Sequence, residues 1–466
     1  MTKNLKICYI GGGSKMWARI FMADLAVTEG LAGEIALYDI DIDAAERNAK
    51  IGRYINDNKK TISKFNYKVY ENLNDALLGA NFVIISILPG TFKEMRSDVH
   101  TPEKYGLYQS VGDTAGPGGV LRAMRTVPIY EEFARKIRDI CPDAWVINLT
   151  NPMSICTKTL FDIFPNIKAF GCCHEVFHAQ ELLTVVLNDI KGIKVDRKEI
   201  YTDACGVNHF TWITKANYGD IDLLSLVPEF IDKYYDEGYY EREGKDRFAF
   251  KYDPFAYGNK VKFDLYNRFG ALGAAGDRHL AEFVPNTWYL KDPDTVREWQ
   301  FGLTTVDYRE ARQKEQIADT IEYASGVKEF PITKSNEEAI DLMKAILGFK
   351  TVVSNVNMPN IGQMSQMPLG SIVETNCVFS NDNVCPVVSR PLPNGAYELV
   401  YKACINVDYC YKAIKERNLE KIYYSFRNQA VCDSLSDKDC RDLFKEMCYN
   451  TRDYLDQYYD LETYFN

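Results

Sequence analysis

Over the first 150 residues, short apolar runs alternate with longer segments whose apolar positions recur at helical spacing. Strands are predicted where the runs are short and continuous, at 6–10, 34–38, 81–88 and 144–149. Helices are predicted between them, at 16–29, 44–56 and 127–139. Because strands joined by helix-length crossovers pair in parallel, the pattern predicts an α/β fold with a doubly wound, Rossmann-type parallel sheet.

Beyond about residue 195 this rhythm weakens, although segments 305–325 and 336–347 still have helical spacing. A chain of 466 residues is long enough for two or three domains. No repeat or low-complexity tract marks a sharp boundary. We expect a Rossmann-type nucleotide-binding domain at 1–195 and a mixed α/β domain at 196–466, packed against the first.

Composition narrows the classes of partner. The net charge is −10, from 55 basic and 65 acidic residues without long like-charge blocks, so neither nucleic acid nor a membrane surface is an expected partner. An anionic substrate would need a local basic pocket. No run approaches the ~18–20 apolar residues of a membrane span. The first apolar run leads directly into glycines, unlike a signal peptide. Thirteen scattered cysteines suit reduced thiols, so we expect a cytoplasmic protein.

A glycine-rich loop follows the first predicted strand. Gly11 and Gly13 permit a tight turn, and Ser14 leads into a helix whose N-terminus can receive a pyrophosphate. Met16 replaces the third glycine of the usual fingerprint. Asp39, at the end of the second strand, can accept ribose hydroxyls and repel a 2′-phosphate, which favours NAD over NADP. A methyltransferase loop, or a glycine turn that binds no nucleotide, remains an alternative.

Three of the five histidines lie in polar or glycine-flanked segments, at 171–175, 206–212 and 276–279. The first segment, with two adjacent cysteines, follows an apolar run and should lie at the carboxyl end of a strand, where open sheets bind ligands. One thiolate and one imidazole make a site for a divalent transition metal with open positions. The alternative for each residue is a satisfied interior position.

Residues 174–178 also spell H-E-x-x-H, the zinc metalloprotease pattern. That pattern needs a helix that places both imidazoles on one face. Here it comes directly after a predicted strand end, and a nucleotide loop is foreign to such proteases. We interpret the match as coincidental.

Several runs carry a family resemblance and follow one another along the chain: 10–14, 116–119 with Arg122, Arg125 and Thr126, 148–153, 171–175 and 206–212. Together they resemble the NAD- and manganese-dependent family 4 glycoside hydrolases. Four runs are most similar to the α-galacturonidase branch of that family: 109–113, 172–177, 208–213 and 274–283. This family is an exception to the two-carboxylate glycosidase mechanism.

The resemblance implies NAD and Mn²⁺ as cofactors, Cys173 and His209 as metal ligands, and Asn151 and His174 as substrate contacts. In such a reaction NAD takes hydride from C3 of the sugar, and the resulting ketone makes the C2 proton acidic. A base removes that proton while the metal holds the enediolate oxygens. The bond from C1 to the leaving oxygen then breaks, water adds, and NADH returns the hydride.

Roles follow for the remaining candidates. His174 is our candidate acid, because an imidazole pKa near ~6.5 allows proton donation close to neutral pH. Asp277 is our candidate base, although other branches use a tyrosine and a helix cap or turn is the alternative for this residue. Arg122 and Arg278 are candidates for binding a uronate carboxylate, with surface ion pairs as the alternative. We place His279 beside the substrate.

We therefore expect a glycosidase that cleaves α-linked galacturonides, assembled as a homo-oligomer. Within the family, an α-galactoside or α-glucuronide is the alternative substrate. A different enzyme class, an NAD-dependent dehydrogenase of the malate or lactate type, would use the same sheet and the same acid after the second strand. A redox-sensing nucleotide-binding module without sugar turnover is the remaining alternative.

Overall fold

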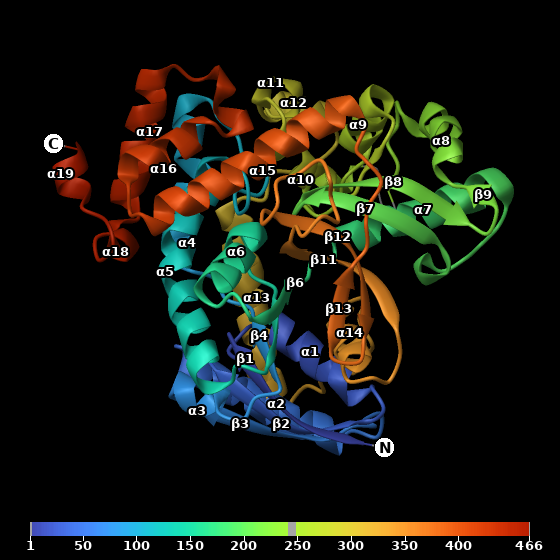
Figure 1. Cartoon of the computed structure of the whole chain (residues 1–466), viewed down its shortest axis with the longest axis vertical. Coiled ribbons are helices and arrows are strands. Elements are labelled where there is room, and N and C mark those ends of the chain that lie inside the picture. Colours follow the sequence, from blue (N-terminus) through green and yellow to red (C-terminus); the bar gives the residue numbers. More distant parts are fainter. Residues whose placement is uncertain (1, 241–247, 466) are drawn as a thin grey trace.

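The computed structural model describes residues 2–240 and 248–465. Within these residues, thirteen strands form one sheet, with the central order β10-β8-β7-β12-β11-β6-β5-β4-β1-β2-β3. In Figure 1 the N-terminal strands lie at the bottom and β7 and β8 lie at the upper right. The molecule is thus built around a single sheet that runs through both halves of the chain.

The N-terminal half supplies six parallel strands in the order β3-β2-β1-β4-β5-β6. These strands are β1 (Lys3–Ile10), β2 (Leu31–Tyr38), β3 (Phe65–Tyr70), β4 (Phe82–Ile85), β5 (Trp145–Asn148) and β6 (Lys168–Gly171). This is the doubly wound order of dinucleotide-binding sheets, so the predicted fold class is confirmed. The edge strand β3 was not predicted.

Helices cover both faces of these strands because successive strand residues point to opposite sides. In β1, Ile7 and Tyr9 join one apolar cluster, whereas Cys8 and Ile10 join another. The helices of this half are α1 (Trp17–Ala26), α2 (Ile42–Asp57), α3 (Leu73–Leu77), α4 (Phe92–His100), α5 (Gly116–Ile140), α6 (Met153–Ile163) and α7 (Glu175–Lys191).

The second half extends the same sheet with antiparallel strands. These are β7 (Tyr201–Val207), β8 (Phe210–Tyr218), β9 (Ile221–Asp222), β10 (Leu272–Gly273), β11 (Val352–Pro359), β12 (Ile372–Ser380) and β13 (Asn383–Pro386). The halves join where Asn357 of β11 pairs with Gly171 of β6. The boundary that we predict at residue 195 falls between α7 and β7, so the sheet crosses it.

Helices of the second half also pack on the first. Both α13 (Val306–Ser325) and α14 (Ala339–Ile346) lie against the N-terminal helices, α13 on α2 and α14 on α1. The C-terminal helices α15 (Asn394–Lys415), α16 (Leu419–Arg427) and α17 (Asp437–Asn450) pack against α5 (Figure 1). The remaining helices are α8 (Val227–Tyr234), α9 (Lys260–Phe269), α10 (Asp277–Leu280), α11 (Asn286–Tyr289), α12 (Pro293–Glu298), α18 (Arg452–Leu455) and α19 (Leu461–Phe465).

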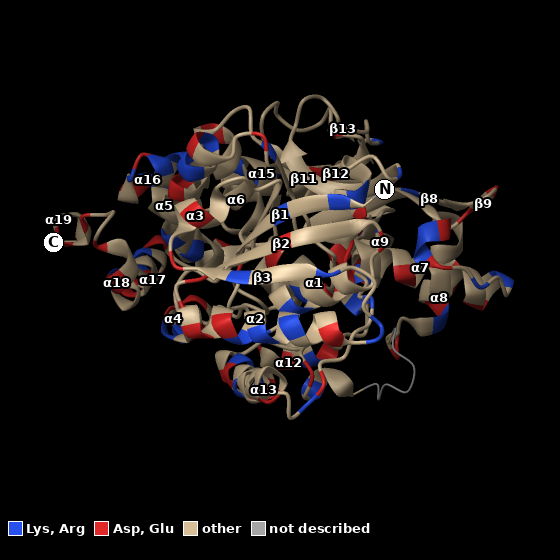
Figure 2. Ribbon diagram, turned by 90° about the horizontal axis from the view of Figure 1, so that it is seen from below, with Lys and Arg blue, Asp and Glu red and all other residues tan. Residues whose placement is uncertain are grey.

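Basic and acidic residues are interspersed along the ribbons of the outer helices, for example on α2 and α4 (Figure 2). Over the described ranges, no helix has both the length and the apolar character that crossing a bilayer requires.

Candidate active site

Three donor side chains from different parts of the chain meet beside the central strands. Asp113 precedes α5, His209 lies in the turn between β7 and β8, and His279 lies on α10. One carboxylate oxygen and one nitrogen of each imidazole all lie within 4.8 Å of one another. Donors of a single ion bound at ~2.0–2.2 Å have such separations. The three side chains therefore form a candidate metal centre.

Neighbouring polar groups orient both imidazoles. Thr114 Oγ1 lies 2.9 Å from Nδ1 of His209, and Glu175 Oε1 lies 3.5 Å from Nε2 of His279. The two rings lie against each other with centroids 4.0 Å apart. His279 Nδ1 is buried without a hydrogen-bond partner among the described residues. Such contacts on the outer nitrogen are typical of metal-binding histidines and leave the other nitrogen free for an ion.

The electrostatics also suit a cation. Burial lowers the pKa of His209, and it lowers the pKa of His279 to about 3, so both imidazoles are neutral near pH 7. Burial alone would raise the pKa of Asp113, but Arg122 and the two histidines hold it below its usual value. A carboxylate with two neutral imidazoles is a donor set that divalent transition metals favour.

Cys173 lies two residues past the end of β6, outside this group of three. Its thiol contacts the side chain of Asn208 and lies near the Glu374 carboxylate. Burial raises the pKa of this thiol well above its usual value. Of the two ligands predicted from the sequence, the structure thus places His209 in the cluster and Cys173 next to Asn208, the neighbour of His209.

His174 immediately precedes α7 and lies beside the start of α1. Its ring centroid is 5.8 Å from that of Trp17 and 5.6 Å from that of His178, and its Nδ1 is 3.3 Å from Glu337 Oε1. The H-E-x-x-H residues do lie at a helix start. Among the described residues, however, the two imidazoles gather no third donor into a metal group.

The Asp277 carboxylate caps the start of a neighbouring helix, α9. It accepts hydrogen bonds from the backbone N–H groups of Val261 (3.2 Å) and Lys262 (3.1 Å). These are the second and third residues of α9, whose own cap residue, Asn259, has a left-handed backbone. The structure therefore gives Asp277 the capping role that the sequence left as the alternative to a catalytic base.

Basic and amide groups surround the metal centre. Arg122 Nη1 lies 3.7 Å from Asp113 Oδ2, and Asn151 Nδ2 lies 3.5 Å from the same oxygen. Arg278 donates from Nη1 to Thr304 Oγ1 at 2.6 Å. Both arginines are buried, and the Nε atom of each lacks a hydrogen-bond partner among the described residues. Neither arginine therefore lies at the surface, where the alternative of a surface ion pair would place it.

The glycine loop forms a tight turn at the carboxyl end of β1. Gly11 has φ of 97°, and a Cβ at this residue would lie 2.0 Å from the carbonyl oxygen of Ser86. Gly13 donates its N–H to Asp39 Oδ2 at 2.8 Å, and Ser14 Oγ accepts the N–H of Trp17 at the start of α1 (3.0 Å). Loop, helix start and acid thus lie together.

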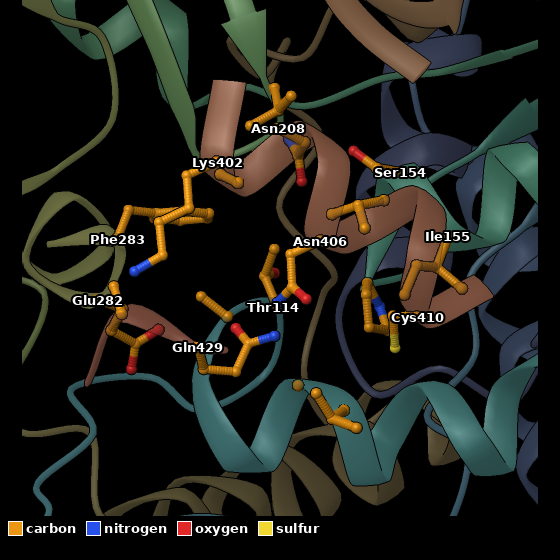
Figure 3. A pocket seen from close by; sticks show the side chains of 18 of the residues that line it. Thr114, Ser154, Ile155, Asn208, Glu282, Phe283, Lys402, Asn406, Cys410 and Gln429 are labelled. Atoms are coloured by element: carbon orange, nitrogen blue, oxygen red, sulfur yellow. The ribbon is translucent and has the colours of Figure 1, made fainter. Parts of the chain in front are cut away.

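A cavity adjoins the metal centre between α5, α6 and α15, and Thr114, Asn208 and Glu282 line it (Figure 3). Glu282 Oε1 accepts the backbone N–H groups of Val111 (2.8 Å) and Gly112 (2.9 Å), which fixes the loop that carries Asp113. Burial raises the pKa of Glu282 to about 7.

Several residues of the site were not assigned from the sequence. Asp113, Glu175 and Glu282 lie inside runs that carry the family resemblance. Their position within these runs was the indication in the sequence that they belong to the site. Arg309, whose positive charge acts on Asp113, lies on α13 without any local pattern that marks it.

A Rossmann-type sheet with a nucleotide loop and a carboxylate–imidazole centre defines a class of nucleotide-binding α/β enzymes. Residues 6–189 match the model of the family 4 glycosyl hydrolases, and residues 204–430 match the model of their C-terminal domain. The chain belongs to this family. The resemblance drawn from the sequence is confirmed, and the alternatives of a malate- or lactate-type dehydrogenase and of a redox-sensing module are not favoured.

Relatives and solved structures extend the comparison. The chain is 49% identical to an α-galacturonidase of Thermoanaerobacterium saccharolyticum over 454 residues, 97% of each chain. It is 43% identical to an α-galacturonidase of Bacillus subtilis over 447 residues, 95% of this chain and 96% of that one. The crystal structure of lplD from Bacillus subtilis superposes with a TM-score of 0.90 at 42% identity, covering 95% of this chain and 99% of that one. A 6-phospho-α-glucosidase from gut microorganisms, solved with NAD and Mn²⁺, shares the fold with a TM-score of 0.80 at 19% identity, covering 97% of this chain and 99% of that one.

Proposed function

We propose that this protein is an α-galacturonidase that works with NAD and Mn²⁺. The observation that carries the proposal is the pair of buried arginines, Arg122 and Arg278, beside the Asp113–His209–His279 centre. In a chain of net charge −10, they form the local basic pocket that an anionic sugar requires. The similarity to α-galacturonidases over nearly the whole chain supports the same substrate.

The residues present fit both cofactors. Gly11, Gly13, Ser14 and Asp39 would hold NAD at the β1–α1 turn. His279 Nδ1, which is buried and has no hydrogen-bond partner in the part of the chain that the structure describes, would bind the cation together with Asp113 and His209. We propose Cys173 as a further donor. When bound, NAD supplies a hydride acceptor, and Mn²⁺ supplies Lewis acidity toward the sugar oxygens.

The chain's own groups position the sugar and move protons. Guanidinium groups of Arg122 and Arg278 match the planar carboxylate of a uronate and would fix its orientation. Asn151 would contact the sugar hydroxyls, whereas both ring nitrogens of His279 have other roles, Nδ1 toward the cation and Nε2 toward Glu175. His174 would protonate the leaving oxygen, since its imidazole is partly exposed at the start of α7 and an imidazole can donate a proton to a leaving group.

We also propose that the enzyme is a cytoplasmic homo-oligomer. Light scattering of the purified protein would measure the assembly, and a monomer at micromolar concentration would contradict this part of the proposal.

Hydrolysis of para-nitrophenyl α-galacturonide tests the function. The assay compares wild-type protein with and without NAD, Mn²⁺ and a thiol reductant, next to the α-galactoside and the α-glucuronide. We expect turnover of the galacturonide only when all three additions are present. Faster turnover of another glycoside would contradict the substrate, and net accumulation of NADH would contradict the glycosidase reaction.

A further inference from the structure

Arg309 is a cation for which the reaction outlined above has no use. It lies in the first turn of α13, and its Nε atom is buried without a hydrogen-bond partner. Within the described ranges, its guanidinium takes part in no hydrogen bond or ion pair. The residue is half-buried. An arginine taken partly out of water is ordinarily paired, so an unpaired one needs a reason.

The start of α13 is fixed against the active site. Thr304 donates its N–H to the carbonyl of Ser110 at 2.9 Å, in the loop that leads to Asp113, and its hydroxyl accepts the hydrogen bond from Arg278. On the other side, Arg96 of α4 pairs with Asp307 (2.7 Å) and Glu310 (3.2 Å). The backbone beside Arg309 is therefore held from two sides.

The charges around this position do not balance. Arg309 and Arg122 both act on the buried Asp113 carboxylate, and Arg278 lies close enough to act on Arg309. Glu282 has a pKa raised by burial to about 7, so it does not supply a full second negative charge near neutral pH. Arg122 also acts on Asp98, but that carboxylate is already paired with Arg125 at 2.5 Å. Three guanidinium groups thus face the Asp113 carboxylate, which leaves room for one more anion.

We propose that Arg309 joins Arg122 and Arg278 in binding the carboxylate of the galacturonide, and that its otherwise unpaired charge favours a uronide over a neutral galactoside. This inference rests on the proposed function. A guanidinium and a carboxylate can form two parallel hydrogen bonds, and Arg278 lies close enough to contribute a third contact. A neutral hydroxymethyl group would leave the Arg309 charge uncompensated, and a site built for a charged group strongly rejects ligands that lack it.

Two substitutions test the proposal, Arg309→Met and Arg309→Lys. Arg312→Gln is the matched control, because Arg312 lies on the same helix, is exposed and, among the described residues, pairs with Glu315 at 2.9 Å. The measurements are kcat/KM for the para-nitrophenyl α-galacturonide and α-galactoside, calorimetric binding of free galacturonate, and calorimetric binding of NAD.

For Arg309→Met we expect about a 100-fold loss of galacturonide kcat/KM, together with weaker galacturonate binding. Galactoside turnover should stay at the wild-type level or rise, because the uncompensated charge that disfavours a neutral sugar is gone. NAD binding should stay within about 3-fold of wild type, since it does not involve the carboxylate site. Arg309→Lys should lose less, because charge is kept and the bidentate geometry is not. The melting temperature of Arg309→Met should equal or exceed that of wild type, since the substitution removes an unpaired, half-buried charge.

Each contrary outcome overturns a specific statement. Equal loss on both glycosides, with a lower melting temperature, would make Arg309 a structural residue. Loss of NAD binding would assign its charge to the nucleotide. Unchanged galacturonide turnover would refute the inference and leave the proposed function intact. A wild-type protein that neither binds nor cleaves galacturonide would refute the proposed function itself.

Discussion

At the scale of single residues, two adjacent cysteines have different surroundings. Cys172 packs in the apolar cluster beneath β1 and β2, whereas the Cys173 thiol contacts Asn208 beside the metal centre. We expect Cys173→Ser to weaken Mn²⁺ binding by about 10- to 100-fold and to reduce turnover with it. Mn²⁺ titration followed by calorimetry measures the effect.

Cys172→Ser is the matched control, and it should lose some stability while keeping its Mn²⁺ affinity. If Cys173→Ser binds Mn²⁺ as tightly as wild type does, the donor set is Asp113, His209 and His279 without a thiolate.

A substitution at Asp277 distinguishes a helix-capping role from the role of catalytic base. Asn at this position can accept only one of the two backbone N–H groups at the start of α9. We expect Asp277→Asn to cost about 1 kcal/mol of folding free energy, the usual size of a lost cap, measured by urea denaturation. Exchange of a C2 deuterium of the substrate with solvent should continue. Loss of that exchange in a variant with wild-type stability would identify Asp277 as the base after all.

Sequence reasoning found most of the residues near the centre because they lie in local patterns. Asn151, His209 and His279 each stand beside glycines or other polar residues that apolar packing does not explain. Arg309 has no such neighbourhood, because it approaches the site only after α13 has packed across α2 and α4. Long-range placement of this kind leaves no local signal in a single sequence.

At the scale of elements, β12 carries a buried carboxylate in the middle of the sheet. Glu374 accepts hydrogen bonds from Thr211 (2.5 Å) and Asn355 (3.2 Å), and burial raises its pKa from 4.5 to about 7. The folded state therefore holds a proton that the unfolded state releases at lower pH. The stabilisation from this group is fully present below about pH 4.5 and is lost as the pH rises through 7.

Glu374→Gln removes this titration. Relative to wild type, we expect the variant to gain stability between pH 5 and pH 8, by an amount on the order of 3 kcal/mol, in urea denaturation without added metal. The exposed Glu298→Gln is the control and should show no such trend. A constant difference between the two proteins across this pH range would contradict a raised pKa for Glu374.

Whether a strand could be predicted from the sequence depended on how continuously its residues are apolar and buried. The predicted strands of the first half correspond to β1, β2, β4 and β5, because each is a continuous apolar run buried on both faces. The edge strand β3 alternates buried and exposed residues over only six positions and escaped detection. The β7–β8 turn has His209, with φ of 67°, where a hairpin turn that begins with Asn usually has glycine, so the sequence did not mark the hairpin either.

At the scale of the whole molecule, the sequence indicated two halves but not how they join. Local periodicity cannot reveal that β11 pairs with β6, because the two strands are nearly 200 residues apart. One sheet therefore crosses the predicted boundary at residue 195, and α13 and α14 of the second half cover helices of the first.

This continuity predicts that the two halves unfold together. Calorimetry of the wild-type protein should show one transition, although NAD would contact mainly the first half. At 100 times its dissociation constant, NAD should stabilise the folded state by about 2.7 kcal/mol and shift that whole transition upward. Mn²⁺ should shift the same transition, since Asp113 comes from the first half and His209 and His279 come from the second. Two resolved transitions, only one of which responds to NAD, would mean that the halves are independent despite the shared sheet. A single transition that responds to each ligand would instead establish that nucleotide and metal binding stabilise one cooperative unit.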